Sequence, residues 1–125
     1  MSRMRREIVQ CMSGLTRKDS ELSARFRFPA SFIGFQGHFP EKKILPGVCQ
    51  LQCAMSMVEE LMQRQVVLRE AVMVKFFHPI EPDQEIDCAC TGLQEGTDSE
   101  FTLKAVMHRE GQKVSEMKLR VSYEE

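Results

Sequence analysis

The sequence predicts an α+β fold in which an antiparallel β-sheet wraps around one long central helix. Residues 48–67 contain neither Gly nor Pro and place apolar side chains at the intervals of a helix. The chain on both sides of this stretch instead alternates apolar and polar residues, as a half-buried strand does. The apolar stripe of the helix needs a large partner, and the apolar face of the sheet is the one available. We expect one domain over residues 1–125.

The first part of the chain is expected to supply a short helix, a strand and a loop before the long helix. Apolar residues at helix-like intervals predict an amphipathic helix over residues 4–12, ending before Ser13 and Gly14. Every second residue is apolar over residues 21–28, which predicts a strand. The aromatic, glycine-rich stretch over residues 32–46 matches neither pattern and is expected to be a loop.

Strands are expected to dominate the chain after the long helix. Alternation predicts them over residues 72–77, 86–90, 101–107 and 117–123. The segment from Pro79 to Asp83 has the chemistry of a turn, and a hairpin turn is expected around Gly111. We interpret His78 and His108 as strand residues.

The composition argues against several classes of function. Of the 125 residues, 42% are apolar and 28% are charged, which is typical of a folded globular chain. The 17 Lys and Arg residues are matched by 18 Asp and Glu residues, so the net charge of -1 offers no general attraction to nucleic acid. No apolar run approaches the length of a signal peptide or a membrane span. We therefore expect a cytoplasmic protein without a nucleic acid or membrane partner.

The 5 cysteines are expected to be free thiols in the core. Their odd number, without the features of a small secreted domain, does not suggest a disulfide framework. Cys88 and Cys90 form a C-x-C pair, and Cys49 and Cys53 would lie one helical turn apart. A zinc site could draw on both pairs, but the C-x-x-C spacing is missing. We therefore favour packed cysteines and no metal site.

One short stretch of the chain carries unusual chemistry. The letters GHFP at 37–40 are followed by LPGV at 45–48, where the long helix is expected to begin. This arrangement brings a histidine, which can act as a base, near the unpaired N–H groups of a helix start. Glycine at such a start lets a substrate approach the backbone, and the prolines stiffen the loop.

With this order and spacing of Gly, His and Pro, the stretch over 37–48 resembles the active-site signature of the hot-dog-fold 3-hydroxyacyl-(acyl carrier protein) dehydratases. The flanking stretches 26–35 and 74–82 resemble the neighbouring strands of that family. The resemblance implies a hot-dog fold and the removal of water from 3-hydroxyacyl thioesters, giving trans-2-enoyl thioesters in fatty-acid biosynthesis. The short chain and its LPGVCQL segment are also similar to the compact dehydratase-like proteins of aryl-polyene pathways.

The resemblance also implies roles for single residues. His38 is the expected base for the α-proton, and the N–H of Gly47 is the expected donor to the enolate oxygen. Gly47, Val48 and Phe39 are expected to bind the substrate. Neither elimination nor hydrolysis of a thioester involves a redox step, so no cofactor is expected.

The chain departs from the family at the second catalytic position. The family has an Asp or Glu 14 positions after the histidine, and this chain has Gln52 there. An amide cannot donate a proton as a carboxylic acid does. Glu59 and Glu60 follow two turns later, roughly 10 Å away by helical rise, and cannot simply substitute.

Three functions are therefore compatible with the sequence. In the favoured one, His38 performs both proton transfers while Gln52 orients a water or the hydroxyl. In the second, the protein is a catalytically weak subunit that binds acyl thioesters and supports an active partner. In the third it is a hot-dog thioesterase, although these enzymes generally need a helix carboxylate that position 52 does not supply. The sequence leaves the acyl chain length, the carrier and the pathway open.

The expected partners are a thioester of acyl carrier protein or coenzyme A and a second copy of the chain. Lys42 and Lys43 lie between His38 and Gly47, where paired positive charge would steer an acidic carrier protein, although a solvated turn explains them equally well. A small sheet around one helix leaves an exposed edge, so we expect a homodimer or higher homo-oligomer joined edge to edge. The family that the chain resembles builds each active site from two protomers.

Overall fold

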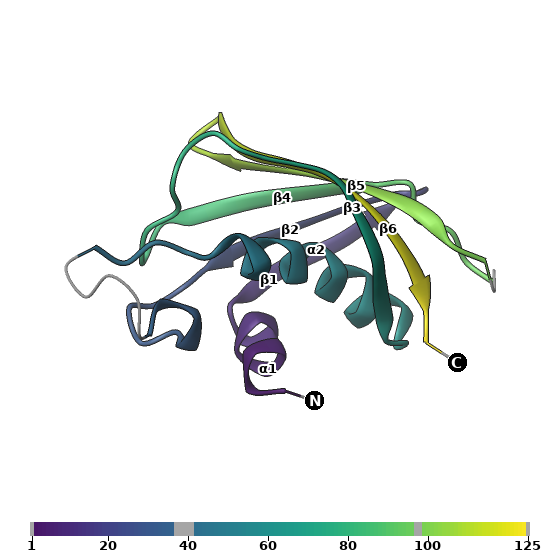
Figure 1. The fold of residues 1–125 in the computed structure, drawn as a ribbon, viewed down its shortest axis with the longest axis horizontal. Coiled ribbons are helices and arrows are strands. Elements are labelled where there is room, and N and C mark those ends of the chain that lie inside the picture. Colours follow the sequence, from purple (N-terminus) through teal and green to yellow (C-terminus); the bar gives the residue numbers. More distant parts are fainter. Residues whose placement is uncertain (1, 37–41, 97–98, 125) are drawn as a thin grey trace.

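The computed structural model describes residues 2–36, 42–96 and 99–124. Its helices are α1 (Arg3–Gln10) and α2 (Gly47–Met62), together with a short 3-10 turn, η1 (Ile33–Phe35). Its strands are β1 (Met12–Lys18), β2 (Glu21–Arg27), β3 (Val66–Phe76), β4 (Glu85–Thr91), β5 (Phe101–Arg109) and β6 (Gln112–Tyr123). The curved sheet arches over α2, and α1 lies below α2 (Figure 1). The predicted α+β arrangement is confirmed.

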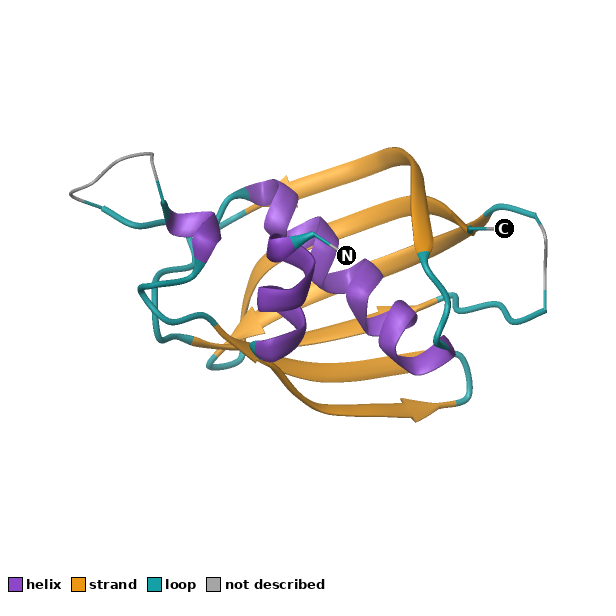
Figure 2. Ribbon diagram, turned by 90° about the horizontal axis from the view of Figure 1, so that it is seen from below, coloured by secondary structure: helices purple, strands orange, loops and turns teal. Residues whose placement is uncertain are grey.

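The strands form one antiparallel sheet in the order β1-β2-β4-β5-β6-β3. β3 follows α2 in the chain but pairs with β6, and β4 returns to pair with β2. This crossover leaves β1 and β3 as the two edges of the sheet. Figure 2 shows α2 lying across the concave face of the sheet, where both can bury their apolar surfaces.

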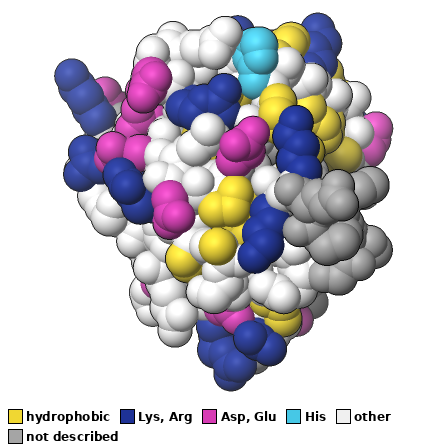
Figure 3. Space-filling view, turned by 90° about the vertical axis from the view of Figure 1, so that its left-hand side faces the viewer, with side chains coloured by type: hydrophobic (Ala, Val, Ile, Leu, Met, Phe, Trp, Pro, Cys, Tyr) yellow, Lys and Arg dark blue, Asp and Glu magenta, His cyan; other side chains and the backbone are white. Residues whose placement is uncertain are grey.

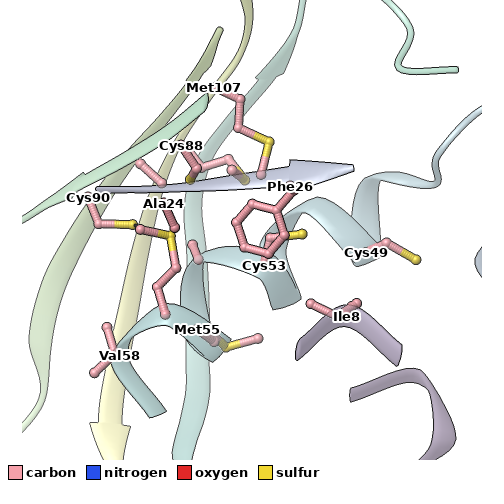
Figure 4. Packing of buried hydrophobic residues seen from close by; sticks show 14 of the residues in the cluster. Ile8, Ala24, Phe26, Cys49, Cys53, Met55, Val58, Cys88, Cys90 and Met107 are labelled. Atoms are coloured by element: carbon pink, nitrogen blue, oxygen red, sulfur yellow. Dashed lines mark hydrogen bonds between the residues drawn. The ribbon is translucent and has the colours of Figure 1, made fainter. Parts of the chain in front are cut away.

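The core lies between the concave face of the sheet and α2. Alternate residues of β2, β4 and β5 are buried, so one face of each strand packs inward. α2 contributes small and sulfur-containing side chains, and Cys49, Cys53 and Met57 are fully buried. In Figure 4, Cys53 lies next to Phe26 of β2, and Ile8 of α1 packs from the opposite side. The helix is thus enclosed by the sheet on one side and by α1 on the other.

The cysteines pack as small apolar residues, as predicted. All of them are free thiols, and Cys49, Cys53, Cys88 and Cys90 are buried while Cys11 is half-buried. Burial raises the pKa of the Cys49 thiol to about 11, so this thiol is protonated at neutral pH.

The described part of the chain has neither a cluster of metal-binding side chains nor a membrane-spanning helix. No group of three or more His, Cys, Asp or Glu side chains among these residues could hold a metal ion. None of their helices is long and apolar enough to cross a membrane.

The first predicted helix is too long at its C-terminal end. α1 ends at Gln10, and the chain from Met12 onward forms β1, a strand that the sequence analysis did not predict. β1 carries a register shift between Ser13 and Thr16, where Gly14 has a φ of 64°. Such a bulge breaks the alternation of apolar and polar residues, which explains why the pattern was missed.

The long helix also ends earlier than predicted, at Met62 rather than near Val67. Gln63 closes it in the left-handed conformation, with a φ of 54°, and its N–H donates to the carbonyl oxygen of Glu59 at 2.8 Å. Glycine is the usual residue at a left-handed helix end, and this chain has Gln63 there, so the sequence does not indicate where α2 ends. β3 therefore begins at Val66, well before the predicted strand.

Candidate active site

A cavity of about 500 Å³ lies where α2 begins. Its walls come from η1, from the segment that leads into α2, and from the end of β3 with the connection to β4. Its apolar lining is supplied mainly by Phe35, Ile44, Leu45, Pro46, Phe76 and Phe77. A cavity of this size and lining suits a small, largely apolar ligand such as an acyl group.

Large apolar side chains are exposed at the mouth of this cavity. The exposed fractions of Ile44, Phe76 and Phe77 are 38%, 51% and 47%. Figure 3 views this end of the molecule, where hydrophobic side chains gather with Lys and Arg side chains beside them. Exposed apolar surface of this kind marks a place where another molecule binds.

The start of α2 presents unpaired backbone donors beside the cavity. Pro46 is the N-cap residue and supplies no side-chain cap, while its carbonyl oxygen accepts from the N–H groups of Cys49 and Gln50 at 3.0 and 3.4 Å. Within the described residues, the N–H groups of Gly47 and Val48 donate to no partner. Unpaired N–H groups and the positive end of the helix dipole together attract an oxygen that carries negative charge.

Gly47 lines the cavity, and its lack of a side chain leaves room for the ring of Phe76. A Cβ atom at this position would lie only 2.6 Å from Cζ of Phe76. Glycine therefore lets the aromatic ring of Phe76 pack directly against the start of the helix. We expected this space to admit the substrate, and in the structure the ring of Phe76 occupies part of it.

The other residues expected to bind substrate or perform chemistry have different outcomes. His38 and Phe39 lie outside the described residues. The chain on either side of them reaches the cavity, since Phe35 and Ile44 both line it. Val48 is 65% exposed and does not line the cavity, because it lies on the outward face of the first turn of α2.

Gln52 is held along α2 and does not line the cavity. Its Nε2 donates to Oγ of Ser56 at 2.9 Å and to Oε1 of Glu59 at 3.3 Å. Glu59 in turn accepts from Nη2 of Arg5 at 2.8 Å and from the N–H of Val66 at 2.9 Å. This carboxylate therefore ties α1, α2 and the start of β3 together, and the described cavity lining includes no carboxylate.

Two further cavity residues were not assigned a function from the sequence. Gln50 is 3% exposed, and its Oε1 has no hydrogen-bond partner in the part of the chain that the structure describes. Its one sequence signal is its place one helical turn after Gly47, which puts both residues on the same face. His78 was predicted to be a strand residue, and this prediction is wrong, because β3 ends at Phe76. His78 lines the cavity, and its N–H donates to the Val114 carbonyl oxygen at 3.3 Å. His108 does lie in a strand, β5.

Comparison with known families places the chain among dehydratases. The sequence profile of the ApeI-like family, described as ApeI dehydratase, matches residues 15–118. The chain belongs to this family. The match spans β2, α2, β3, β4 and β5 together with all the residues that line the cavity, and it confirms the resemblance that the motif at 37–48 predicted.

Solved structures show the same fold. The dehydratase heterocomplex ApeI:P from Xenorhabdus doucetiae is similar at 21% identity and a TM-score of 0.75, covering 89% of this chain and 96% of that one. A hypothetical thioesterase with coenzyme A from Streptococcus pneumoniae TIGR4 is similar at 7% identity and a TM-score of 0.68, covering 97% and 94%. The uncharacterized protein PH1136 from Pyrococcus horikoshii is similar at 15% identity and a TM-score of 0.67, covering 92% and 85%. The expected hot-dog fold is thereby confirmed, and no curated protein matches the chain.

Proposed function

We propose that the protein acts in the cytoplasm to dehydrate 3-hydroxyacyl thioesters to trans-2-enoyl thioesters in fatty-acid or polyene biosynthesis. One observation carries this proposal: the unpaired N–H groups at the start of α2 lie beside an apolar cavity of about 500 Å³. Membership in a dehydratase family supports the choice of reaction. The cavity receives the acyl chain, and the helix start receives the thioester carbonyl.

The proposed chemistry is an elimination that needs no electron acceptor. His38 takes the proton from C2, and the electron pair of that bond forms the new C2=C3 double bond through the enolate. The N–H of Gly47 donates to the enolate oxygen, which carries the charge that develops in the transition state. The hydroxyl group leaves C3 as water when His38 returns the proton.

Gln52 can take part in this reaction only if it reaches the cavity of a second protomer. Its amide is bonded to Ser56 and Glu59 and lies outside the cavity of its own chain. Because the dehydratases that the chain resembles build each active site from two protomers, we infer that Gln52 serves the cavity of the partner in a homodimer. There it orients the water that forms.

A second candidate function is favoured by a specific observation. Position 52, where the family has its acid, is Gln52, and its amide bonds to Ser56 and Glu59, so the usual acid of a dehydratase is missing. A similar solved structure is the dehydratase heterocomplex ApeI:P. On this alternative the protein binds acyl thioesters and supports an active partner. The same lack of a carboxylate argues against a hot-dog thioesterase.

Turnover by the purified protein alone separates these functions. We expect the protein to convert a 3-hydroxyacyl thioester of acyl carrier protein or coenzyme A to the enoyl product, detected by mass spectrometry. His38→Ala should abolish the conversion, while His108→Ala, in β5 and outside the cavity, should not. Binding of the thioester without turnover would support the acyl-binding function, and release of free acid would support the thioesterase.

A further inference from the structure

The side chain of Gln50 carries an unpaired acceptor in the wall of the cavity. The residue is 3% exposed, and its Oε1 accepts no hydrogen bond from the described residues. A buried acceptor without a partner costs free energy, which an apolar side chain of the same size would avoid. The position therefore carries a polar group that the folded chain itself does not use.

The usual local partner is unavailable to Gln50. A glutamine near the start of a helix can bond back to the backbone of the N-cap residue. The N-cap residue of α2 is Pro46, which has no N–H to offer. Among the other described lining residues, His78 alone has a polar side chain, and it forms no hydrogen bond with Oε1 of Gln50. The acceptor is therefore left for a molecule that enters the cavity.

Gln50 and Gly47 are spaced to contact one small molecule. They are three residues apart on α2, so they share a helix face and differ in height by roughly 4.5 Å. In a 3-hydroxyacyl thioester, the carbonyl carbon and the hydroxyl-bearing carbon are separated by a single carbon atom. A carbonyl oxygen bound at the N–H of Gly47 therefore leaves the hydroxyl within reach of the next turn of the helix.

We propose that Oε1 of Gln50 accepts a hydrogen bond from the C3 hydroxyl of the substrate and makes Gln50 a specificity-determining residue. This inference rests on the proposed function, because it needs an acyl thioester in the cavity. The enoyl product has no C3 hydroxyl and leaves Oε1 unpaired again. Gln50 thus favours the hydroxylated substrate over both the product and saturated acyl chains.

Paired ligands that differ only in the hydroxyl test this inference. Amide analogues of pantetheine thioesters are prepared with 3-hydroxyacyl and saturated acyl groups of matched chain length, in a short, a medium and a long version. Their dissociation constants are measured by calorimetry for the wild type, Gln50→Met and Gln50→Glu. We expect the wild type to bind the best hydroxylated analogue about tenfold more tightly than its saturated match. Gln50→Met should lose this preference, and Gln50→Glu should keep it because a carboxyl group offers an acceptor oxygen in either protonation state.

The thermal unfolding temperature distinguishes a ligand-binding role of Gln50 from a purely structural one, because the two roles predict opposite changes in Gln50→Met. Removing the unpaired acceptor should leave the unfolding temperature of ligand-free Gln50→Met equal to or above that of the wild type. A clear fall in that temperature would show that Gln50 holds the fold together and would overturn the inference.

The failures of the two proposals are distinguishable. If the wild type binds both members of each pair equally, or if Gln50→Met keeps the full preference, the role of Gln50 is wrong while acyl binding stands. If the wild type binds none of the analogues at any chain length, the proposed function fails and this inference fails with it.

Discussion

Of two glutamines on α2, the one that faces the cavity of its own chain is not the one to which the sequence assigned a role. Gln52 occupies the family's acid position but bonds to Ser56 and Glu59, whereas Gln50 is buried in the cavity wall. Residues i and i+2 of an α-helix differ by roughly 200° around the helix axis, so the amides of Gln50 and Gln52 point in different directions. The missing acid is visible in the sequence, but the glutamine that faces the cavity is identified by the fold.

Gln52→Glu should couple activity to a pH-dependent loss of stability. The new carboxylate restores the acid of the family, so turnover should rise. It also lies where an amide now donates to Oε1 of Glu59 at 3.3 Å, and two carboxylates so close cannot both ionise freely. The close contact raises the pKa of the two coupled carboxyl groups in the folded variant above its value in the unfolded chain. The variant is therefore most stable at low pH, where the carboxyl groups are protonated, and it loses stability as the pH rises. We expect a destabilisation of roughly 1–2 kcal/mol at neutral pH, measured by chemical denaturation.

Gln52→Met is the control for this variant. It removes the same hydrogen bonds without adding a charge, so its stability loss should not depend on pH between about pH 5 and pH 8. An equally flat profile for Gln52→Glu would contradict the proposed contact with Glu59. If the wild type is inactive and Gln52→Glu is active, the protein is a dehydratase that has lost its acid and is kept for binding.

At the scale of elements, α1 fixes the start of the segment that leads to the cavity. Oε1 of Glu7 accepts a hydrogen bond from the N–H of Ile33 in η1 at 2.9 Å. Its Oε2 accepts from Nε of Arg3 at 2.7 Å, which keeps the carboxylate in place. Because Phe35 of the same turn lines the cavity, α1 supports the site without touching it.

The stability of the protein should fall on acidification partly through Glu7. The hydrogen bond from Ile33, followed by the contact with Arg3, lowers the pKa of the Glu7 carboxyl from its ordinary value of 4.5. A lowered pKa contributes stability that is present above the ordinary value and is lost as pH falls. Glu7→Gln should therefore unfold at a lower temperature than the wild type at about pH 7, and the difference should shrink toward about pH 3.

Glu81→Gln provides the matched comparison for Glu7→Gln. Glu81 is exposed, and its side chain makes no hydrogen bond or ion pair within the described residues. Its replacement should leave the difference in unfolding temperature near zero at both pH values. If Glu7→Gln has the same unfolding temperature as the wild type at every pH, the hydrogen bond from Ile33 to Glu7 contributes nothing to stability.

At the scale of the whole molecule, the two edges of the sheet differ in character. β3 exposes large apolar side chains, with Leu68 at 37% and Val72 at 42% exposure. β1 exposes polar residues such as Thr16 and Arg17 instead. An apolar edge with unpaired backbone groups is the one that pairing with a second copy would cover.

The homodimer should therefore form through β3. We expect light scattering to show a dimer at micromolar concentration for the wild type. Val72→Lys should weaken dimerisation roughly tenfold or more by placing a charge in the interface. Thr16→Lys, the same change in kind on the opposite edge, should leave the dimer intact. A monomeric wild type would exclude edge-to-edge assembly.

Charge beside the cavity should guide an acidic carrier protein. Lys42 is exposed, whereas Nζ of Lys43 donates to the carbonyl oxygen of Ala30 at 3.2 Å and is less free to contact a partner. Replacing both lysines by Glu should weaken binding of acyl carrier protein by roughly tenfold at low salt and less at high salt, with Lys42→Glu giving most of the effect. Lys104→Glu on β5 is the control, and unchanged affinity in the double variant would remove these lysines from the interface.

The fold class, the family and the helix start that carries Gly47 can be predicted from the amino-acid sequence. They depend on local patterns: the alternation in β2, β4 and β5, the helical spacing in α2, and the order of Gly, His and Pro over 37–47. The sequence patterns do not show that β3 crosses over to β6 and becomes an exposed edge, that Glu59 bonds to Arg5 and Val66, or that Gln50 faces the cavity. The bulge in β1 and the left-handed residue Gln63 were not predicted either, because neither position has the residue pattern that usually marks such a feature. The strand order, the bonds of Glu59 and the surroundings of Gln50 depend on contacts between residues far apart in the chain, which local periodicity does not reveal.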